Sequence, residues 1–230
     1  MDRRLIVVMA LALLMIAPSL GEAQKAKAGS RSGSGALKLP TAKRKVGLSV
    51  EEALQKRLST KAYLPRPVGK DKLAQVLWAM AGVNRPKEGK RTHPSPMAKY
   101  TVDVYVADGT GTYKYDALGH KLVPVPSAAK FKGGPRKMLP KKDYVKVAPV
   151  LIMLVGDVTR LPAKFPENMR WNWIHCEAGT MCQNLHLQCA ALDLGTCVNA
   201  GFDGDTAKAM LGLKKGSKVL YVLPLGHPKK

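Results

Sequence analysis

The chain of 230 residues is long enough for one domain with a sizeable core, and its apolar share of 46% is typical of a globular protein. A fully disordered basic chain is thereby excluded. The formal net charge of +22 at pH 7 predicts a surface that attracts phosphates, nucleic acid or anionic lipid headgroups. Such a charge characterises the surface and does not by itself define a function.

Residues 1–23 have the pattern of a cleaved secretory signal. Arg3 and Arg4 precede an apolar run from Leu5 to Ala17, and small residues follow where a signal peptidase would cleave. A membrane-spanning helix needs about 20 apolar residues, so an uncleaved anchor is the weaker alternative. We therefore expect an exported protein, periplasmic or secreted, with no transmembrane segment after cleavage.

A basic disordered linker is predicted at 24–46, because this stretch has almost no large apolar residue with which to form a core. The folded domain is then expected at 47–230. Its first helix begins with a capping box at Ser49 and Glu52 and runs to about Arg57. Periodicity and turn residues predict, in chain order, a helix at 70–81, strands at 100–106 and 112–115 joined by a turn at 108–111, an irregular excursion at 124–142, a buried strand at 148–155, a long helix at 172–194 ended by Gly195, a short helix at 206–211 and a strand at 218–223.

The four cysteines, Cys176, Cys182, Cys189 and Cys197, have spacings of six, seven and eight, which fit neither a zinc site nor a haem attachment motif. Export implies an oxidising compartment, where disulfides form. On one helix, however, Cys182 and Cys189 would lie about 10 Å apart, too far for a disulfide. We interpret most of the cysteines as small buried residues of the core and expect no metal.

Arg57, Ser59 and Lys61, at the end of the first helix, put three side chains suited to phosphate within five residues. Taken alone, the grouping also fits a solvated basic helix end. In the order of its segments, however, the chain resembles the FMN-dependent nitroreductase superfamily, whose Arg-x-Ser-x-Arg/Lys signature is similar to residues 57–61. The resemblance implies that Arg57, Leu58, Ser59 and Lys61 hold the flavin phosphate and ribityl chain.

The Arg-Thr-His-Pro-Ser segment at 91–95, with Tyr113–Asp116 downstream, is similar to the azoline dehydrogenases of thiazole and oxazole biosynthesis, a subgroup of that superfamily. In the wider family this Pro-Ser loop reaches the flavin of the partner subunit. The resemblance therefore implies a homodimer with FMN at the interface, contacted by Pro94 and Ser95. The chain departs from the family at Pro96-Met97-Ala98, which lacks the Asn and Gln common in nitroreductases.

Two later segments continue the resemblance. Glu177-Ala178-Gly179 is similar to the start of the family's central helix, and residues 199–203 match the loop whose backbone N–H groups approach flavin N5 and O4. Ala200 and Gly201 would line the ring edge, where a glycine allows close approach of the backbone. Taken singly, Glu177 could instead be a favourable charge early in a helix, and Gly201 a plain turn residue.

The expectation is thus an α+β nitroreductase-like fold, with a mixed or antiparallel sheet flanked by helices. The expected function is two-electron redox by an FMN enzyme on a small-molecule substrate, with the electron donor left open. No catalytic side chain is predicted, because a flavin itself accepts and returns the electrons. Two alternatives remain. The chain could be a secreted basic binding protein, although its aromatic content of only 6% counts against nucleic acid as the ligand. It could also be a family member that has lost FMN and catalysis.

Overall fold

The computed structural model describes residues 35–129, 135–139 and 143–229, within one compact unit that extends from Gly35 to Lys230. The predicted signal at 1–23 and the first part of the predicted linker lie outside the described residues. No helix in the described part of the chain is both long and apolar enough to cross a bilayer.

A seven-stranded sheet forms the centre of the domain, in the order β1-β6-β5-β4-β7-β9-β8, and its neighbouring strands are antiparallel. The strand β7 pairs with β4 on one side and β9 on the other, and all of its residues except Asp157 are buried. A separate hairpin joins β2 to β3. The strands are β1 (Leu37–Lys38), β2 (Val83–Arg85), β3 (Lys90–Arg91), β4 (Val102–Asp108), β5 (Gly111–Asp116), β6 (Lys121–Pro124), β7 (Val150–Asp157), β8 (Gly195–Thr196) and β9 (Ser217–Gly226).

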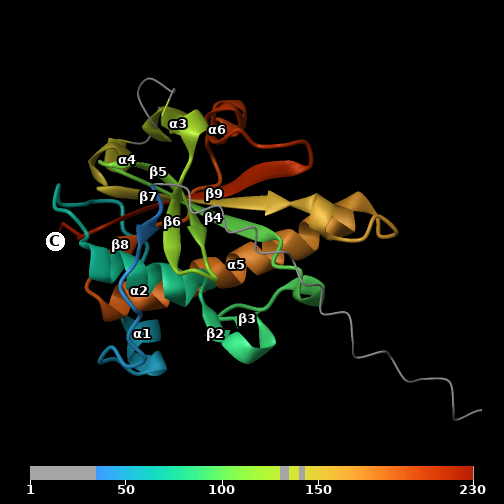
Figure 1. The fold of residues 1–230 in the computed structure, drawn as a ribbon. Coiled ribbons are helices and arrows are strands. Elements are labelled where there is room, and N and C mark those ends of the chain that lie inside the picture. Colours follow the sequence, from blue (N-terminus) through green and yellow to red (C-terminus); the bar gives the residue numbers. More distant parts are fainter. Residues whose placement is uncertain (1–34, 130–134, 140–142, 230) are drawn as a thin grey trace, which may run out of the picture. The chain divides into compact units, whose positions relative to one another are not determined.

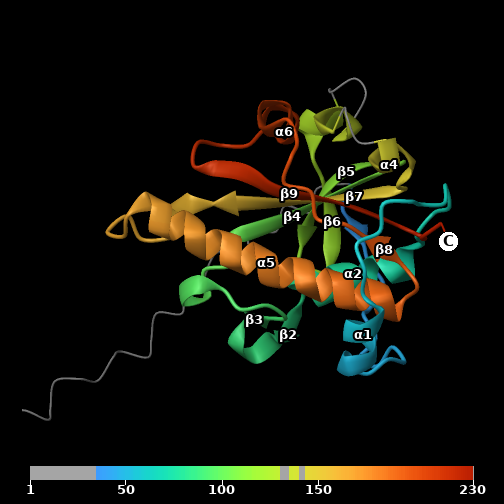
Figure 2. The same cartoon turned by 180° about the vertical axis from the view of Figure 1, so that it is seen from behind.

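Helices cover both faces of this sheet (Figures 1 and 2). One face carries α1 (Val50–Lys56), α2 (Lys70–Ala81) and the long α5 (Glu167–Ala191), and the other carries α3 (Pro126–Ala129), α4 (Asp143–Val147) and α6 (Gly204–Leu211). Short 3-10 turns occur at Pro86–Glu88, Pro96–Ala98, Pro135–Met138 and Val158–Arg160. A hydrophobic cluster fills the space on each side of the sheet, which confirms the predicted α+β fold class.

The helices follow the sequence pattern closely where caps or apolar periodicity define them. The capping box of Ser49 and Glu52 is present at the start of α1, and α2 spans 70–81 as predicted. The buried side of α5 includes Ile174, Met181, Leu185 and Cys189, again as predicted.

The limits of α5 differ from those predicted. The helix begins at Glu167 after Pro166, five residues earlier, because its first turn is polar and shows no apolar period. It ends at Ala191, and Asp193 takes a left-handed φ of 53°. Gly195 is therefore not the helix stop. It belongs to β8, where an added Cβ would lie 2.5 Å from the Thr60 hydroxyl.

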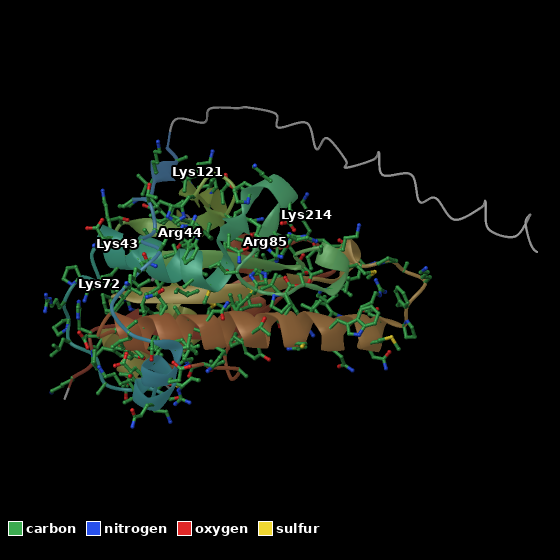
Figure 3. The ribbon with its side chains drawn as sticks, turned by 90° about the horizontal axis from the view of Figure 1, so that it is seen from below. Lys43, Arg44, Lys72, Arg85, Lys121 and Lys214 are labelled. Carbon is green, nitrogen blue, oxygen red and sulfur yellow. The ribbon has the colours of Figure 1, made fainter. Side chains whose placement is uncertain are left out.

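The predicted linker is too long at its C-terminal end, because residues 35–46 pack on the domain. The strand β1 pairs with β6, and Leu39 is only 8% exposed. Further along, the Lys43 N–H donates to Gln75 Oε1 at 2.7 Å, and the Arg44 guanidinium lies over the Trp78 ring. Lys43 and Arg44 lie near each other on this segment, whereas the other labelled cations come from separate elements (Figure 3). A few specific contacts hold a segment that its composition alone predicts to be disordered.

The cysteines are free thiols, and three of them are buried: Cys182, Cys189 and Cys197. Burial raises the pKa of Cys182 to about 12, so this side chain behaves as a small apolar group. The interpretation of most cysteines as core residues is confirmed, while Cys176 is exposed. Among the described residues no cluster of three or more His, Cys, Asp or Glu side chains could hold a metal ion.

Candidate functional site

The predicted phosphate segment lies in extended backbone beside β8. Ser59 forms a parallel bridge with Thr196, and the Thr60 N–H donates to the Thr196 carbonyl at 2.9 Å. Thr60 is buried, whereas Arg57, Leu58, Ser59 and Lys61 are exposed. The four predicted contacts thus lie on the open surface of this segment.

The loop at 199–201 lies at the same edge of the sheet. Asn199 pairs with Val222 of β9, its amide donates to the carbonyls of Cys197 and Val222, and its side-chain oxygen accepts from the Tyr144 hydroxyl. Ala200 and Gly201 follow directly and are exposed. Residues 199–201 follow Thr196, the bridge partner of Ser59, by three to five positions, so the structure places the predicted phosphate end and the predicted ring edge on neighbouring stretches of the chain.

Arg57 and Leu58 also line a cavity of about 550 Å³ at the C-terminal half of α5. Its charged lining includes Lys56, Arg57 and Arg66, opposed by the single carboxylate Asp193. Neither Arg57 nor Lys61 forms an ion pair with any acidic side chain in the described residues. Both cations are therefore available to an anion, which is what a flavin phosphate requires. Ser59 and Lys61 do not line this cavity.

Two histidines, His186 and His227, lie in the cavity wall, and the sequence predicted a site role for neither. Burial and then the nearby Arg57 lower the pKa of His186. Burial, followed by Lys72 and Arg66, lowers the pKa of His227. Both rings are therefore neutral at pH 7, and the positive potential comes from the lysine and arginines. The sequence placed His186 on the predicted long helix, but it gave no indication that this side chain lies near Arg57.

Pro94 and Ser95 lie in another place, against the N-terminal half of α5. The Ser95 hydroxyl donates to Glu177 Oε2 at 2.7 Å and accepts from the Tyr100 N–H at 2.7 Å. Its proton is therefore already engaged and is not free for a cofactor. Glu177 and His186 are nine positions apart on one helix, or about 13 Å along its axis. The structure does not bring Pro94 and Ser95 next to Arg57 within one chain.

Glu177 is a buried carboxylate with a full set of donors, and its residue is 2% exposed. Besides Ser95, the Thr101 N–H and hydroxyl donate to Oε2 at 3.2 and 2.7 Å, and the Val102 N–H donates to Oε1 at 3.3 Å. His93 Nε2 lies 3.4 Å from Oε1. Burial opposes ionisation, but these hydrogen bonds outweigh it and lower the pKa of Glu177. The role of Glu177 is thus more than a favourable charge early in a helix.

A second cavity of about 550 Å³ adjoins this carboxylate. Aromatic and other apolar side chains supply most of its wall, and the Phe165 and Trp173 rings meet edge to face at 5.0 Å between centroids. Its remaining lining comes from Pro94, Ser95, Pro96, Met97, Cys176, Glu177 and Thr180. A cavity of this size and character suits a small organic molecule.

The family model for the nitroreductase family matches residues 54–227. The chain belongs to the nitroreductase family. It is 26% identical over 188 residues to a candidate nitroreductase of Methanocaldococcus jannaschii, covering 78% of this chain and 91% of that protein. Members of the family are oxidoreductases, so this protein is an oxidoreductase by family.

Solved structures agree with this assignment. A candidate nitroreductase of Ralstonia eutropha superposes with a TM-score of 0.76 at 28% identity, covering 85% of this chain and 90% of that chain. A chain of the E. coli microcin synthetase McbBCD complex with truncated pro-MccB17 shares the fold, with a TM-score of 0.60, 19% identity, and coverage of 83% and 77% of the two chains. At this identity the likeness shows a shared fold.

Proposed function

We propose that this family member is an exported FMN-dependent oxidoreductase that carries out two-electron redox on a small organic molecule. The observation that carries the proposal is the edge of the sheet where Arg57, Ser59 and Lys61 are exposed near the loop at 199–201, and where neither Arg57 nor Lys61 forms an ion pair with another described residue. A flavin mononucleotide has a dianionic phosphate at one end and a ring at the other. The cationic segment at 57–61 suits the phosphate end of such a molecule, and the neighbouring loop at 199–201 suits its ring.

Each segment would have its own task. Arg57 and Lys61 would neutralise the phosphate, and Ser59 would donate a hydrogen bond to the phosphate or the ribityl chain. The backbone N–H groups of Ala200 and Gly201 would meet the ring edge, where donors favour electron density. When bound, the flavin supplies the electron acceptor and donor chemistry, so no protein nucleophile is required.

A homodimer would complete the site. Pro94 and Ser95 lie about 13 Å along α5 from the region of Arg57, so the Pro-Ser loop reaches a flavin there only from a second copy. The surface around α1 supports such a contact. Val50 and Leu54, four residues apart on the helix, are 64% and 50% exposed, and Leu58, just after the helix, is 62% exposed. An exposed apolar row of this kind is typical of a protein interface.

The proposed location outside the cytoplasm rests on residues 1–23, which resemble a secretory signal. In that compartment NAD(P)H, the usual reductant of the family, is not expected. The proposal therefore includes either a different electron donor or a substrate that the flavin oxidises.

The decisive experiment is a flavin titration of the purified mature protein. FMN should bind with a perturbed visible spectrum, bleach with dithionite, and reoxidise with an electron acceptor. Riboflavin, which lacks the phosphate, should bind much more weakly. Absence of any spectral change at micromolar FMN would refute the proposal.

The phosphate contact has its own test, the double variant Arg57→Ala/Lys61→Ala. It should lose at least about tenfold in FMN affinity, since a hydrogen bond to a charged group contributes about 1.5 to 3 kcal/mol, while riboflavin affinity stays the same. The control Lys87→Ala/Lys90→Ala removes the same charge from the region of the β2–β3 hairpin and should bind FMN normally. Equal losses in both double variants would point to general electrostatic attraction instead.

A further inference from the structure

A further cavity lies at the end of the sheet where β4 ends and β7 begins, with α4 and the start of α2 on opposite faces beside it (Figures 1 and 2). Its volume is about 520 Å³, and it shares no lining residue with the cavity at Arg57 or with the cavity at Glu177. Within the segment 64–67, Leu64 and Arg66 line the cavity at Arg57, whereas Pro65 and Pro67 line this one. A ligand here would therefore occupy a place of its own.

Apolar side chains form most of the wall of this cavity. Val68, Leu73 and Val150 are buried, and they belong to the hydrophobic cluster on the α2 face of the sheet. Val147, at the end of α4, lines the cavity while 44% of its surface is exposed. An apolar ligand would cover this surface and gain free energy from its burial. A cavity of this size and composition is suited to a small organic molecule.

The guanidinium of Arg136 supplies a polar anchor in the lining. One of its terminal nitrogens, Nη2, donates to the Ala148 carbonyl at 2.7 Å, and its Nε is buried without a hydrogen-bond acceptor. No carboxylate of the described residues pairs with it. A guanidinium carries five N–H donors, and a carboxylate matches their planar geometry. Arg136 therefore lacks the counter-ion that a carboxylate ligand would provide.

The other charged groups of the lining are Lys70 and Asp108. One Asp108 oxygen, Oδ1, accepts from the Thr110 N–H and hydroxyl at 2.8 and 2.6 Å and from the Gly111 N–H at 3.2 Å, so this carboxylate belongs to the β4–β5 turn. With Lys70 and Arg136 positive and Asp108 negative, the lining has a single net positive charge. That charge balances a monoanion, whereas Asp108 would repel the second charge of a phosphate dianion.

We propose that this cavity is a binding site for a small monocarboxylate with an apolar body. The carboxylate pairs with Arg136, and the apolar body lies against Val68, Leu73 and Val150. Lys70, exposed at the rim, adds attraction for the negative charge. The site is independent of the proposed redox function, because it requires neither a flavin nor a second copy of the chain.

The test is a calorimetric titration of octanoate into the purified mature protein, with and without FMN. Octanoate should bind saturably in both cases. The alcohol 1-octanol has the same chain length without the charge and should bind at least about tenfold more weakly, because it loses the charged hydrogen bonds to Arg136. Absence of saturable octanoate binding, or equal affinity for the two probes, would overturn the inference. Failure of FMN to bind would instead refute the proposed function and leave this result standing.

Two neighbouring cations of one 3-10 turn provide a matched pair of variants. Arg136→Gln and Lys137→Gln each remove one positive charge, but only Arg136 lines the cavity, while Lys137 is exposed outside it. Arg136→Gln should weaken octanoate binding by about tenfold, and Lys137→Gln should leave it unchanged. The same loss in both variants would show attraction by the general surface charge and would overturn the site.

Two further variants keep the inference testable if Arg136→Gln does not fold. Val147→Trp places a large side chain at the partly exposed wall, removes no side-chain hydrogen bond, and should abolish octanoate binding. Arg57→Ala should leave that binding intact, because Arg57 lines a different cavity. Octanoate binding that survives Val147→Trp, or that is lost in Arg57→Ala, would show that the carboxylate binds elsewhere.

Discussion

The two halves of α5 support opposite kinds of electrostatic environment. Near its C-terminal half, Arg57 and Lys61 are exposed and form no ion pair in the described chain, so a negative ligand can be bound without breaking an internal contact. Near its N-terminal half, Glu177 is buried and accepts hydrogen bonds from Ser95, Thr101 and Val102. Free charge suits recognition, whereas satisfied buried charge suits the positioning of a loop.

The largest expected effect comes from Glu177→Ala. This change leaves the donors of Ser95, Thr101 and Val102 unpaired in the interior, and we expect a loss of about 3 to 5 kcal/mol in the free energy of unfolding. Urea denaturation measures it. Arg57→Ala is the counterpart in the other region and should change this free energy by less than about 0.5 kcal/mol, because the side chain is exposed. Similar losses from both would erase the distinction between the two regions.

A smaller effect is expected at the loop near Arg57. Tyr144→Phe removes the hydroxyl that donates to Asn199 and should cost about 1 kcal/mol of unfolding free energy. FMN affinity should fall as well, because Asn199 directly precedes Ala200 and Gly201. Tyr113→Phe removes a hydroxyl that contacts Thr110, remote from this loop, and serves as the control. A loss of FMN affinity in the control alone would contradict the expectation.

Strain in the Ser95–Tyr100 loop can be measured by comparing two changes at one position. Met97→Gly relieves the positive φ and should raise the free energy of unfolding by up to about 1 kcal/mol relative to Met97→Ala, which keeps the strain. Both variants lack the methionine side chain, so their difference reports on the backbone. A less stable glycine variant would mean that the loop is not strained.

The smallest expected effects are on the pH dependence of stability, and they fall in different pH windows for the two regions. The folded-state pKa of His186 is lowered from 6.5, so its contribution is complete above about pH 6.5 and is lost as the pH falls through the folded value. The pKa of Glu177 is lowered from 4.5, so its contribution is lost only below about pH 4.5. We expect His186→Gln to flatten the plot of unfolding free energy against pH below about pH 6.5, and Glu177→Gln to flatten it only below about pH 4.5. Flattening in the opposite windows would contradict this expectation.

Sequence reasoning was most successful where a local signal suffices. The capping box at Ser49 and Glu52, the apolar period of α2 and the buried side of α5 each depend on residues within a few turns of one another. It was wrong for residues 35–46, whose packing depends on β6 and on Gln75 and Trp78, all distant in the chain. The prediction that Gly195 ends the long helix was also wrong, because Gly195 belongs to β8 and packs against Thr60.

For the candidate site, the sequence by itself determined the basic segment at 57–61 and the loop at 199–201. It also determined the family resemblance, which depends on the order of these segments. Only the tertiary structure decided that Ser59 pairs with Thr196 and that Ser95 is hydrogen-bonded to Glu177. It also decided that the two cavities lie against different halves of α5. The physical reason is that hydrogen-bond partners separated by 82 positions, as Ser95 and Glu177 are, leave no periodic trace in a sequence. Local patterns predict elements, and long-range pairing decides which side chains remain free to bind.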